Sequence, residues 1–255
     1  MPIASIAYEL KDRLEEPGCP ICQVAVHSAE RFVKHLHWWL INDGSIRESL
    51  LRDWGYCPQH TQLVAYVEAQ MFGDWLGTNI LFQALDRHIA AELAQYQVAT
   101  RASTPLRRIL DFFVRRLHLQ PEIPRSVGCD ICRHSQFAAA STLSALLEEI
   151  QIDPERWQPL YLHSDGLCLS HLLQALQRHA EKWPSPVQWV LANRIELLHR
   201  QADAMEEYAL KCSWDRRLDE KTEEELHAWQ HSLAFLSGYP ASALLPPGQD
   251  TGKRE

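Results

Sequence analysis

The 255-residue chain lacks several features that define large classes of proteins. No apolar run approaches the ~20 residues that span a membrane, and residues 1–16 alternate apolar and charged side chains instead of forming a secretory signal. Basic residues are in deficit, with 25 Lys and Arg against 33 Asp and Glu and a net charge of −8. The lack of a signal and of a spanning segment predicts a cytoplasmic protein without a membrane partner. Because binding to phosphates needs clustered cations, we also expect no nucleic-acid partner.

Motifs of common enzymes are missing as well. The sequence has no Gly-rich phosphate loop, no Gly-x-Ser-x-Gly elbow and no His-Glu-x-x-His element. Glu196 and His199 have the Glu-x-x-His spacing of di-iron helix bundles, but that chemistry needs a second such motif, which the sequence lacks. The sequence therefore favours a protein that is not an enzyme, although an enzyme with a groove between two halves of the chain remains an alternative.

What the chain does contain is a repeated set of metal-ligand residues. Seven cysteines are too few and too odd in number for a disulfide framework, and Cys212 stands apart from the other six. The six belong to two copies of one pattern, a Cys-x-x-Cys followed after 34 or 35 residues by a Cys-x-x-His. The first copy comprises Cys19, Cys22, Cys57 and His60, and the second comprises Cys129, Cys132, Cys168 and His171.

Three thiolates and one imidazole form a complete tetrahedral ligand set for zinc. A catalytic zinc usually keeps one position open for water, so closed Cys3His sets predict two structural zinc ions per chain. The spacing allows each copy to close its own site, while a crossed arrangement between the copies stays open. An iron–sulfur cluster, a redox dithiol or a zinc-releasing thiol switch are the alternatives.

Prolines distinguish the two copies. Pro20 and Pro58 follow ligand cysteines at a favoured first helical position, which places Cys19 and Cys57 at helix N-termini, where a thiolate is stabilised. The second copy has Asp130 and Leu169 instead. We therefore expect its site to be the weaker or more altered one.

The pattern of helices predicts an all-α protein of ten or eleven helices, built as a tandem duplication of a zinc-stapled repeat with a C-terminal helix. The predicted divisions are repeat 1 at 1–99, repeat 2 at 105–212, a C-terminal helical segment at 213–238 and a disordered tail at 239–255. Predicted helices cover 3–15, 23–41, 74–97, 105–119, 133–150 and 185–211, with 98–104 as a linker. Predicted N-caps are Ser45, Asp153, Ser185 and Thr222, and Gly238 is the predicted helix stop.

The last long helix carries a narrow apolar seam with steps of three and four residues. Packing inside the fold is the expected role of this seam, and self-association as a homodimer is the alternative. The seam residues are Leu191, Ile195, Leu198, Ala202, Met205 and Ala209. Most of the nine tryptophans, among them Trp38, Trp75 and Trp157, are expected to be core anchors.

The Gly-Cys-Pro-Ile-Cys and Gly-Tyr-Cys-Pro-Gln-His elements, ending at Cys22 and His60, resemble those of a bacterial family of unknown function. Its members carry paired Cys-Pro-x-Cys and Cys-Pro-x-His motifs in a helical chain, and the likeness extends over residues 3–238. The resemblance supports the expected fold and metal sites and implies no activity. The sequence as a whole predicts a zinc-binding helical module whose partner is a protein.

Overall fold

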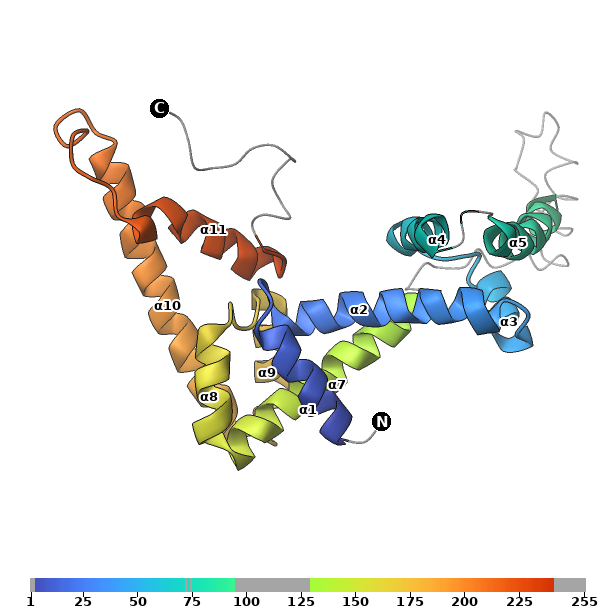
Figure 1. Cartoon of the computed structure of the whole chain (residues 1–255), viewed down its shortest axis with the longest axis horizontal. Helices are drawn as coiled ribbons and strands as arrows, with labels where there is room; N and C mark the ends of the chain where they lie inside the picture. Colours follow the sequence, from blue (N-terminus) through green and yellow to red (C-terminus); the bar gives the residue numbers. More distant parts are fainter. Residues whose placement is uncertain (1–2, 72, 74, 95–128, 241–255) are drawn as a thin grey trace, which may run out of the picture. The chain divides into compact units, whose positions relative to one another are not determined.

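The structure, a computed structural model, describes residues 3–71, 73, 75–94 and 129–240, with side chains from residue 9 onwards. Every regular element in these parts of the chain is a helix and none is a strand, which confirms the all-α prediction (Figure 1). The predicted helix at 105–119, the linker at 98–104 and nearly all of the predicted tail lie outside the described residues. No helix within the described ranges is long and apolar enough to cross a membrane.

The helices follow one another with short connections. Before the gap at 95–128 they are α1 (Ile3–Leu14), α2 (Pro20–His35), the π-helical segment η1 (Leu36–Leu40), α3 (Gly44–Arg52), α4 (Pro58–Met71) and α5 (Leu76–Ala94). After it they are α7 (Asp130–Ile152), α8 (Pro154–His163), α9 (Leu169–Arg178), α10 (Pro184–Lys211) and α11 (Glu223–Ser237).

The chain divides into two compact units. The first unit combines residues 1–27 with 135–255, and the second unit comprises residues 28–134. Both divisions fall inside helices, α2 and α7, each of which contributes residues to both units. The units therefore differ from the predicted sequential repeats at 1–99 and 105–212, because the N-terminal residues fold with the C-terminal half of the chain.

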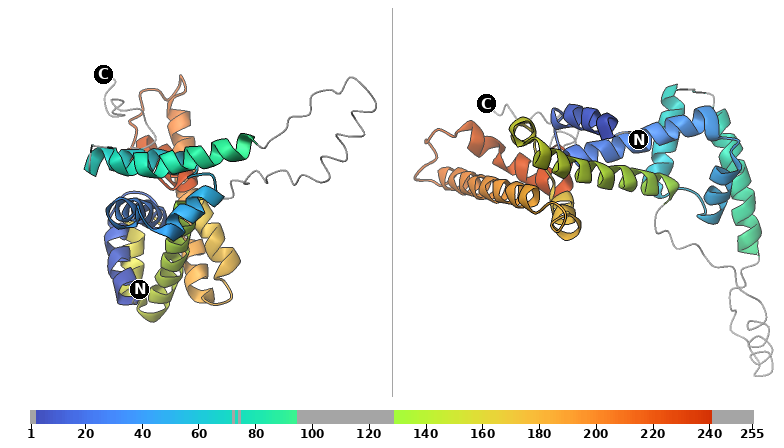
Figure 2. Two further views of the ribbon diagram at one scale, coloured as in Figure 1. Left: turned by 90° about the vertical axis from the view of Figure 1, so that its right-hand side faces the viewer. Right: turned by 90° about the horizontal axis from the view of Figure 1, so that it is seen from below.

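The first unit has one apolar core. Leu10 and Leu14 of α1 are buried in it together with Trp157 and Tyr161 of α8. In this unit α1 packs against α8, and α11 packs against α10 and α9 (Figure 2). The core thus joins residues from both ends of the sequence, which explains why the unit is discontinuous. The remaining buried members come from α2, α7, α9, α10 and α11 and from the loops that precede α2 and α9.

The second unit has two smaller clusters. One surrounds Cys129 and Ile131 at the start of α7 with Val33 of α2 and Val64 of α4. The other joins residues of η1, α3 and α5, where α3 and α4 each pack against α5. Its buried members are Leu36, Leu50, Leu81 and Leu85.

Helix termini test the predicted caps. The capping box at Thr222 is formed, Asp153 accepts from the Arg156 amide, and Gly238 ends α11 in the left-handed conformation, as predicted. The predicted cap Ser45 is wrong, because the Asp43 carboxylate accepts from the Ser45 and Ile46 amides and caps α3 instead. Ser185 is also wrong as a cap, since α10 already begins at Pro184.

Two predictions about packing are wrong. No seam residue of α10 is fully buried: three are exposed, with Ile195 at 46%, and three are half-buried, while the helix buries a different face that includes Val187, Val190 and Ala204. Trp157 is a core anchor, 1% exposed, but Trp38 and Trp75 are 59% and 42% exposed. For α10, apolar periodicity did not identify the buried face, and for the tryptophans, side-chain size did not predict burial.

Candidate metal centres

All four ligand half-motifs open a helix in the same way. Helices α2, α4, α7 and α9 each begin one residue after a ligand cysteine. The carbonyl of that cysteine accepts the first helical hydrogen bond in each case, from Gln23, Thr61, Arg133 and Leu172 respectively. The first ligand is therefore the N-cap and the second is the third helical residue, so both lie at the helix end whose dipole favours negative charge. The predicted helix-terminal position of the cysteines is confirmed.

The structure brings the eight predicted ligands together as two groups of four. Centre 1 consists of Cys19, Cys22, Cys168 and His171, and all of its potential ligand atoms lie within 4.8 Å of one another. Centre 1 lies in the first unit.

Centre 2 consists of Cys57, His60, Cys129 and Cys132, under the same limit of 4.8 Å. It lies wholly in the second unit. Each centre thus combines a Cys-x-x-Cys from one copy with a Cys-x-x-His from the other. The expectation of one site within each copy is wrong, and the crossed arrangement is found.

The direction of α2 explains the crossing. This helix starts at centre 1 and continues without a break for 16 residues, ~24 Å, so that its C-terminal part belongs to the second unit. Cys57 and His60 therefore lie in the second unit, where the start of α7 supplies Cys129 and Cys132.

The ligand atoms of centre 1 surround a common point. The Nδ1 atom of His171 lies 3.5 Å from the Cys19 sulfur, 3.4 Å from that of Cys22 and 3.3 Å from that of Cys168. The sulfurs of Cys22 and Cys168 are 3.8 Å apart. This spacing is too wide for a disulfide and leaves room for one ion between the four atoms.

Centre 2 has the same dimensions. The Nδ1 atom of His60 lies 3.2 Å from the sulfurs of Cys57 and Cys132 and 3.4 Å from that of Cys129. The Cys132 sulfur is 3.7 Å from that of Cys57 and 3.8 Å from that of Cys129. Both centres therefore present Nδ1, not Nε2, to the shared point.

Protons are held unequally among the ligands of centre 1. Hydrogen bonds with Cys168 and Cys19 raise the pKa of Cys22, and hydrogen bonds from Cys19 and Cys22 lower that of Cys168. Burial disfavours a charged His171, but hydrogen bonds to Cys168 and Cys19 outweigh it and raise its pKa to about 9. A bound cation would displace the protons that the raised pKa values of Cys22 and His171 retain.

In centre 2 burial is the main cause of the shifts. It raises the pKa of Cys132 to about 11 and lowers that of His60. A neutral imidazole is the form that ligates a metal, so the burial of His60 suits a ligand. The thiol of Cys132 would need a cation in place to lose its proton near neutral pH.

The end of α11 covers centre 1. Gly238 has φ +81°, and a Cβ at this position would lie 2.4 Å from the Cys22 sulfur and 3.4 Å from that of Cys168. Its carbonyl accepts from the Cys19 amide at 3.1 Å. Only a residue without a side chain fits here, so the glycine that stops α11 also allows the backbone to approach the sulfurs.

Two further hydrogen bonds fix the loops that carry the ligands of centre 1. The amide of Gly18 donates to the Asp165 carboxylate at 2.6 Å. The amide of Leu167, next to Cys168, donates to the buried Tyr161 hydroxyl at 3.1 Å. Burial raises the pKa of Tyr161 to about 12, so the hydroxyl is neutral and accepts this bond. Asp165 and Tyr161 were not identified from the sequence, because no short motif marks them.

Asp130 has a role of its own beside centre 2. Its carboxylate accepts from the Ser49 hydroxyl and from Arg133, which also donates to Asp53 at 2.6 Å. The residue that replaces proline in this half-motif therefore ties the start of α7 to α3 and its C-terminus. An acidic residue in the first turn of α7 also complements the helix dipole.

The crossed pairing removes the basis for expecting a weaker second site. Centre 1 combines the Pro20 half-motif with the Leu169 half-motif, and centre 2 combines Pro58 with Asp130. Each centre thus has one half-motif with proline and one without.

Among the described residues no other group of three or more His, Cys, Asp or Glu has a ligand-like arrangement. Cys212 is an exposed free thiol.

The fold and the two centres define a helical protein with paired Cys3His sets that could hold metal ions. Comparison of the chain with models of protein families, curated proteins and solved structures finds no match.

Proposed function

We propose that the chain binds two zinc ions, one in each centre, and that these ions are structural. The supporting observation is the size of the two ligand sets. Zinc–sulfur bonds of ~2.3 Å and zinc–nitrogen bonds of ~2.0 Å at tetrahedral angles require sulfurs ~3.8 Å apart and sulfur–nitrogen distances of ~3.5 Å. The observed distances are 3.7–3.8 Å between sulfurs and 3.2–3.5 Å from sulfur to Nδ1.

Four protein ligands leave no coordination position for water or substrate, which favours a structural role over a catalytic one. The compact sets also favour a single ion over an iron–sulfur cluster, whose cysteines bind different iron atoms. In centre 1 the ion would join residues as distant in sequence as Cys19 and His171, 152 positions apart. Such a crosslink stabilises the fold because the unfolded chain has no preformed site.

The helices that the two ions hold together act as a binding or scaffold module for a protein partner. The lack of catalytic motifs in the sequence and the closed form of both ligand sets support this proposal. The proposal includes membership of the bacterial family with duplicated Cys-Pro motifs. It also includes a bacterial and cytoplasmic origin and a homodimer as the assembly.

Native mass spectrometry of paired variants tests the crossed centres. The variant Cys22→Ser/His171→Ala damages one centre twice and should retain one zinc. The variant Cys22→Ser/His60→Ala damages both centres and should lose both ions. The opposite result would show that each copy closes its own site. Cys212→Ser is the matched control and should keep two zinc ions, because this cysteine is exposed and outside both groups.

Removal of the metal tests the structural role. Chelation should lower the melting temperature of the full chain strongly, and re-addition of zinc should restore it. Zinc-free protein that retains the melting temperature and the circular dichroism of the zinc form would reject the structural role while leaving zinc binding intact.

A thiol switch is the second candidate, favoured by the partial exposure of Cys22, Cys57 and Cys132 and by sulfur pairs 3.7–3.8 Å apart. Hydrogen peroxide would oxidise two thiols to one disulfide and be reduced to two water molecules, with release of the ion. A zinc indicator should then respond to peroxide, and dithiothreitol should reverse the response. Thiols that stay protected while zinc stays bound would argue against a switch.

A further inference from the structure

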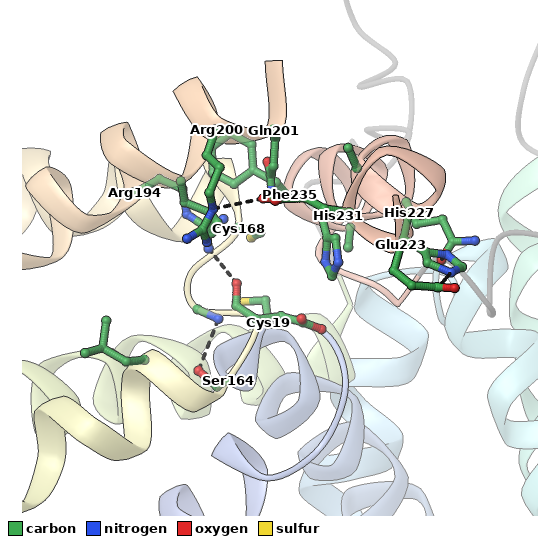
Figure 3. A pocket seen from close by; sticks show the side chains of 18 residues that line it. Cys19, Ser164, Cys168, Arg194, Arg200, Gln201, Glu223, His227, His231 and Phe235 are labelled. Atoms are coloured by element: carbon green, nitrogen blue, oxygen red, sulfur yellow. Dashed lines mark hydrogen bonds and ion pairs between the residues drawn. The ribbon is translucent and has the colours of Figure 1, made fainter. Parts of the chain in front are cut away.

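A pocket of about 540 Å³ lies in the first unit between α10, α11 and the loop at 164–168. Its lining includes the ligand cysteines Cys19 and Cys168, so its floor borders centre 1. Figure 3 shows Arg194, Arg200 and Gln201 on the α10 side and His227, His231 and Phe235 on the α11 side. The volume is that of pockets that hold small organic molecules.

Arg194 is the most unusual residue of this pocket. Its side chain is charged although the residue is only 4% exposed. One guanidinium nitrogen donates to the Asp165 carbonyl at 2.5 Å, the guanidinium lies 4.8 Å from the Phe235 ring centre, and it interacts with the Tyr161 hydroxyl. All of these partners are neutral, and Nε has no hydrogen-bond partner. A buried cation without an anionic partner is costly unless a ligand supplies the charge.

The backbone is adapted to this position of Arg194. Gly166 has φ +67°, and a Cβ there would lie 2.7 Å from the Nη2 atom of Arg194. The lack of a side chain at Gly166 thus allows the guanidinium to approach the backbone of the loop. No Asp or Glu within the described ranges forms an ion pair with Arg194.

The other acidic and basic residues of the lining are Asp165, Arg200, Glu223 and Glu224. Arg200 pairs with Glu224 at 3.2 Å, and Glu223 pairs with His227 at 3.2 Å. These side chains are largely exposed, in contrast to Arg194. In the buried part of the pocket Arg194 has no ion pair among the described residues, and the Asp165 carboxylate accepts from the Gly18 amide instead.

Gln201 adds a second buried polar group. It is 4% exposed, and its Oε1 atom has no hydrogen-bond partner. The rest of the lining is partly apolar, from Leu162, Leu197, Ala228, Ala234 and Phe235. A buried guanidinium and an amide beside an apolar wall fit an acid group on an apolar body.

From this arrangement we infer that the pocket binds a small organic carboxylate, with the carboxylate on Arg194, a polar group at Gln201 and an apolar body against Leu197 and Phe235. A guanidinium matches a carboxylate in shape and charge. This ligand site is independent of the nature of the ion in centre 1, although it borders that centre.

Fluorine NMR of the metal-loaded full chain tests this site with 4-fluorobenzoate as the probe. The probe resonance should broaden and shift when protein is added, whereas neutral 4-fluorobenzyl alcohol should bind at least about tenfold more weakly, since a hydrogen bond to a charged group is lost. Equal binding of the two probes, or no binding of 4-fluorobenzoate at millimolar concentration, would overturn the proposal. Displacement by equimolar inorganic phosphate would overturn the carboxylate class.

Variants locate the binding. Arg194→Met keeps an unbranched chain over Phe235 and should weaken 4-fluorobenzoate binding at least about tenfold. Leu197→Trp keeps the arginine and fills the pocket, so it should abolish binding even if Arg194→Met fails to fold. Arg52→Met, at an exposed position of the second unit, is the matched control and should bind as the wild type does. Unchanged binding to Leu197→Trp would place the probe elsewhere and refute the site. The zinc content of each variant, measured in parallel, separates this result from the metal proposal.

Discussion

Gly238 provides the sharpest test of the link between α11 and centre 1, through the substitution Gly238→Ala. The added methyl group would lie 2.4 Å from the Cys22 sulfur, whereas ordinary non-bonded contacts between such atoms are ~3.5–4.0 Å. One of the two atoms must therefore move by more than ~1 Å. Zinc sites tolerate changes in ligand distance of only ~0.2 Å.

Two effects add in this variant. A non-glycine residue in the left-handed conformation costs ~1–2 kcal/mol of folding free energy wherever it occurs. The clash adds a cost that is specific to centre 1, because either the sulfur leaves its position or α11 withdraws and the Cys19 amide loses the Gly238 carbonyl. By analogy with changes in the groups around metal ligands, we expect zinc affinity at one of the two sites to fall ~10–100-fold.

The assay is competition between the protein and a chromophoric zinc chelator, which resolves two sites of different affinity. Gly73→Ala is the matched control, since Gly73 also has positive φ, at +71°, but no atom lies within 4 Å of its added Cβ. The control should lose stability in urea by ~1–2 kcal/mol and keep both zinc affinities. A folded Gly238→Ala protein with two unchanged affinities would refute the packing of α11 on centre 1.

Two further predictions concern the first unit. Tyr161→Phe removes the acceptor of the Leu167 amide and should lower the free energy of unfolding in urea by ~1–3 kcal/mol; a loss below ~0.5 kcal/mol would mean that water replaces the hydroxyl. Hydrogen bonds from Lys211, at 2.7 and 2.9 Å, lower the pKa of Glu225, so this pair stabilises the fold above the ordinary glutamate pKa and loses its effect as the pH falls. Glu225→Gln should therefore melt at a lower temperature than the wild type at pH 7, with a difference that shrinks below about pH 4; a difference independent of pH would contradict this role.

The ligand set and its local structure could be predicted from the sequence because they depend on short-range chemistry. A Cys-x-x-Cys or Cys-x-x-His places two ligands on one helical turn, and the helix end stabilises the thiolate. The four half-motifs accordingly open α2, α4, α7 and α9. The caps at Asp153 and Thr222 were predictable for the same reason.

The pairing of the half-motifs could not be predicted, since it depends on where a helix leads the chain. Residue spacing allowed Cys22 to meet either His60 or His171. The choice follows from the unbroken course of α2 and from the burial of Leu10 and Leu14 with the C-terminal half. Arg194 was missed because a lone arginine on a helix carries no signal of its burial.

The crossed pairing also has an energetic consequence that needs no contact between the two units. The ligands of centre 2 are 69–75 positions apart across its two half-motifs, and those of centre 1 are 146–152 apart. Centre 2 therefore lies inside the loop that centre 1 closes. An ion in centre 2 links its two half-motifs directly. The loop that centre 1 must close then becomes about half as long.

Halving a flexible loop lowers its closure cost by ~0.6 kcal/mol, which corresponds to a factor of about three in affinity. We expect Cys57→Ser, which disables centre 2, to weaken zinc binding at centre 1 by about threefold, as measured by chelator competition. Since linkage is reciprocal, Cys168→Ser should weaken centre 2 by the same factor. A coupling of a hundredfold would exceed what loop closure can supply and would require a structural path along α2 or α7, the two helices that contribute residues to both units.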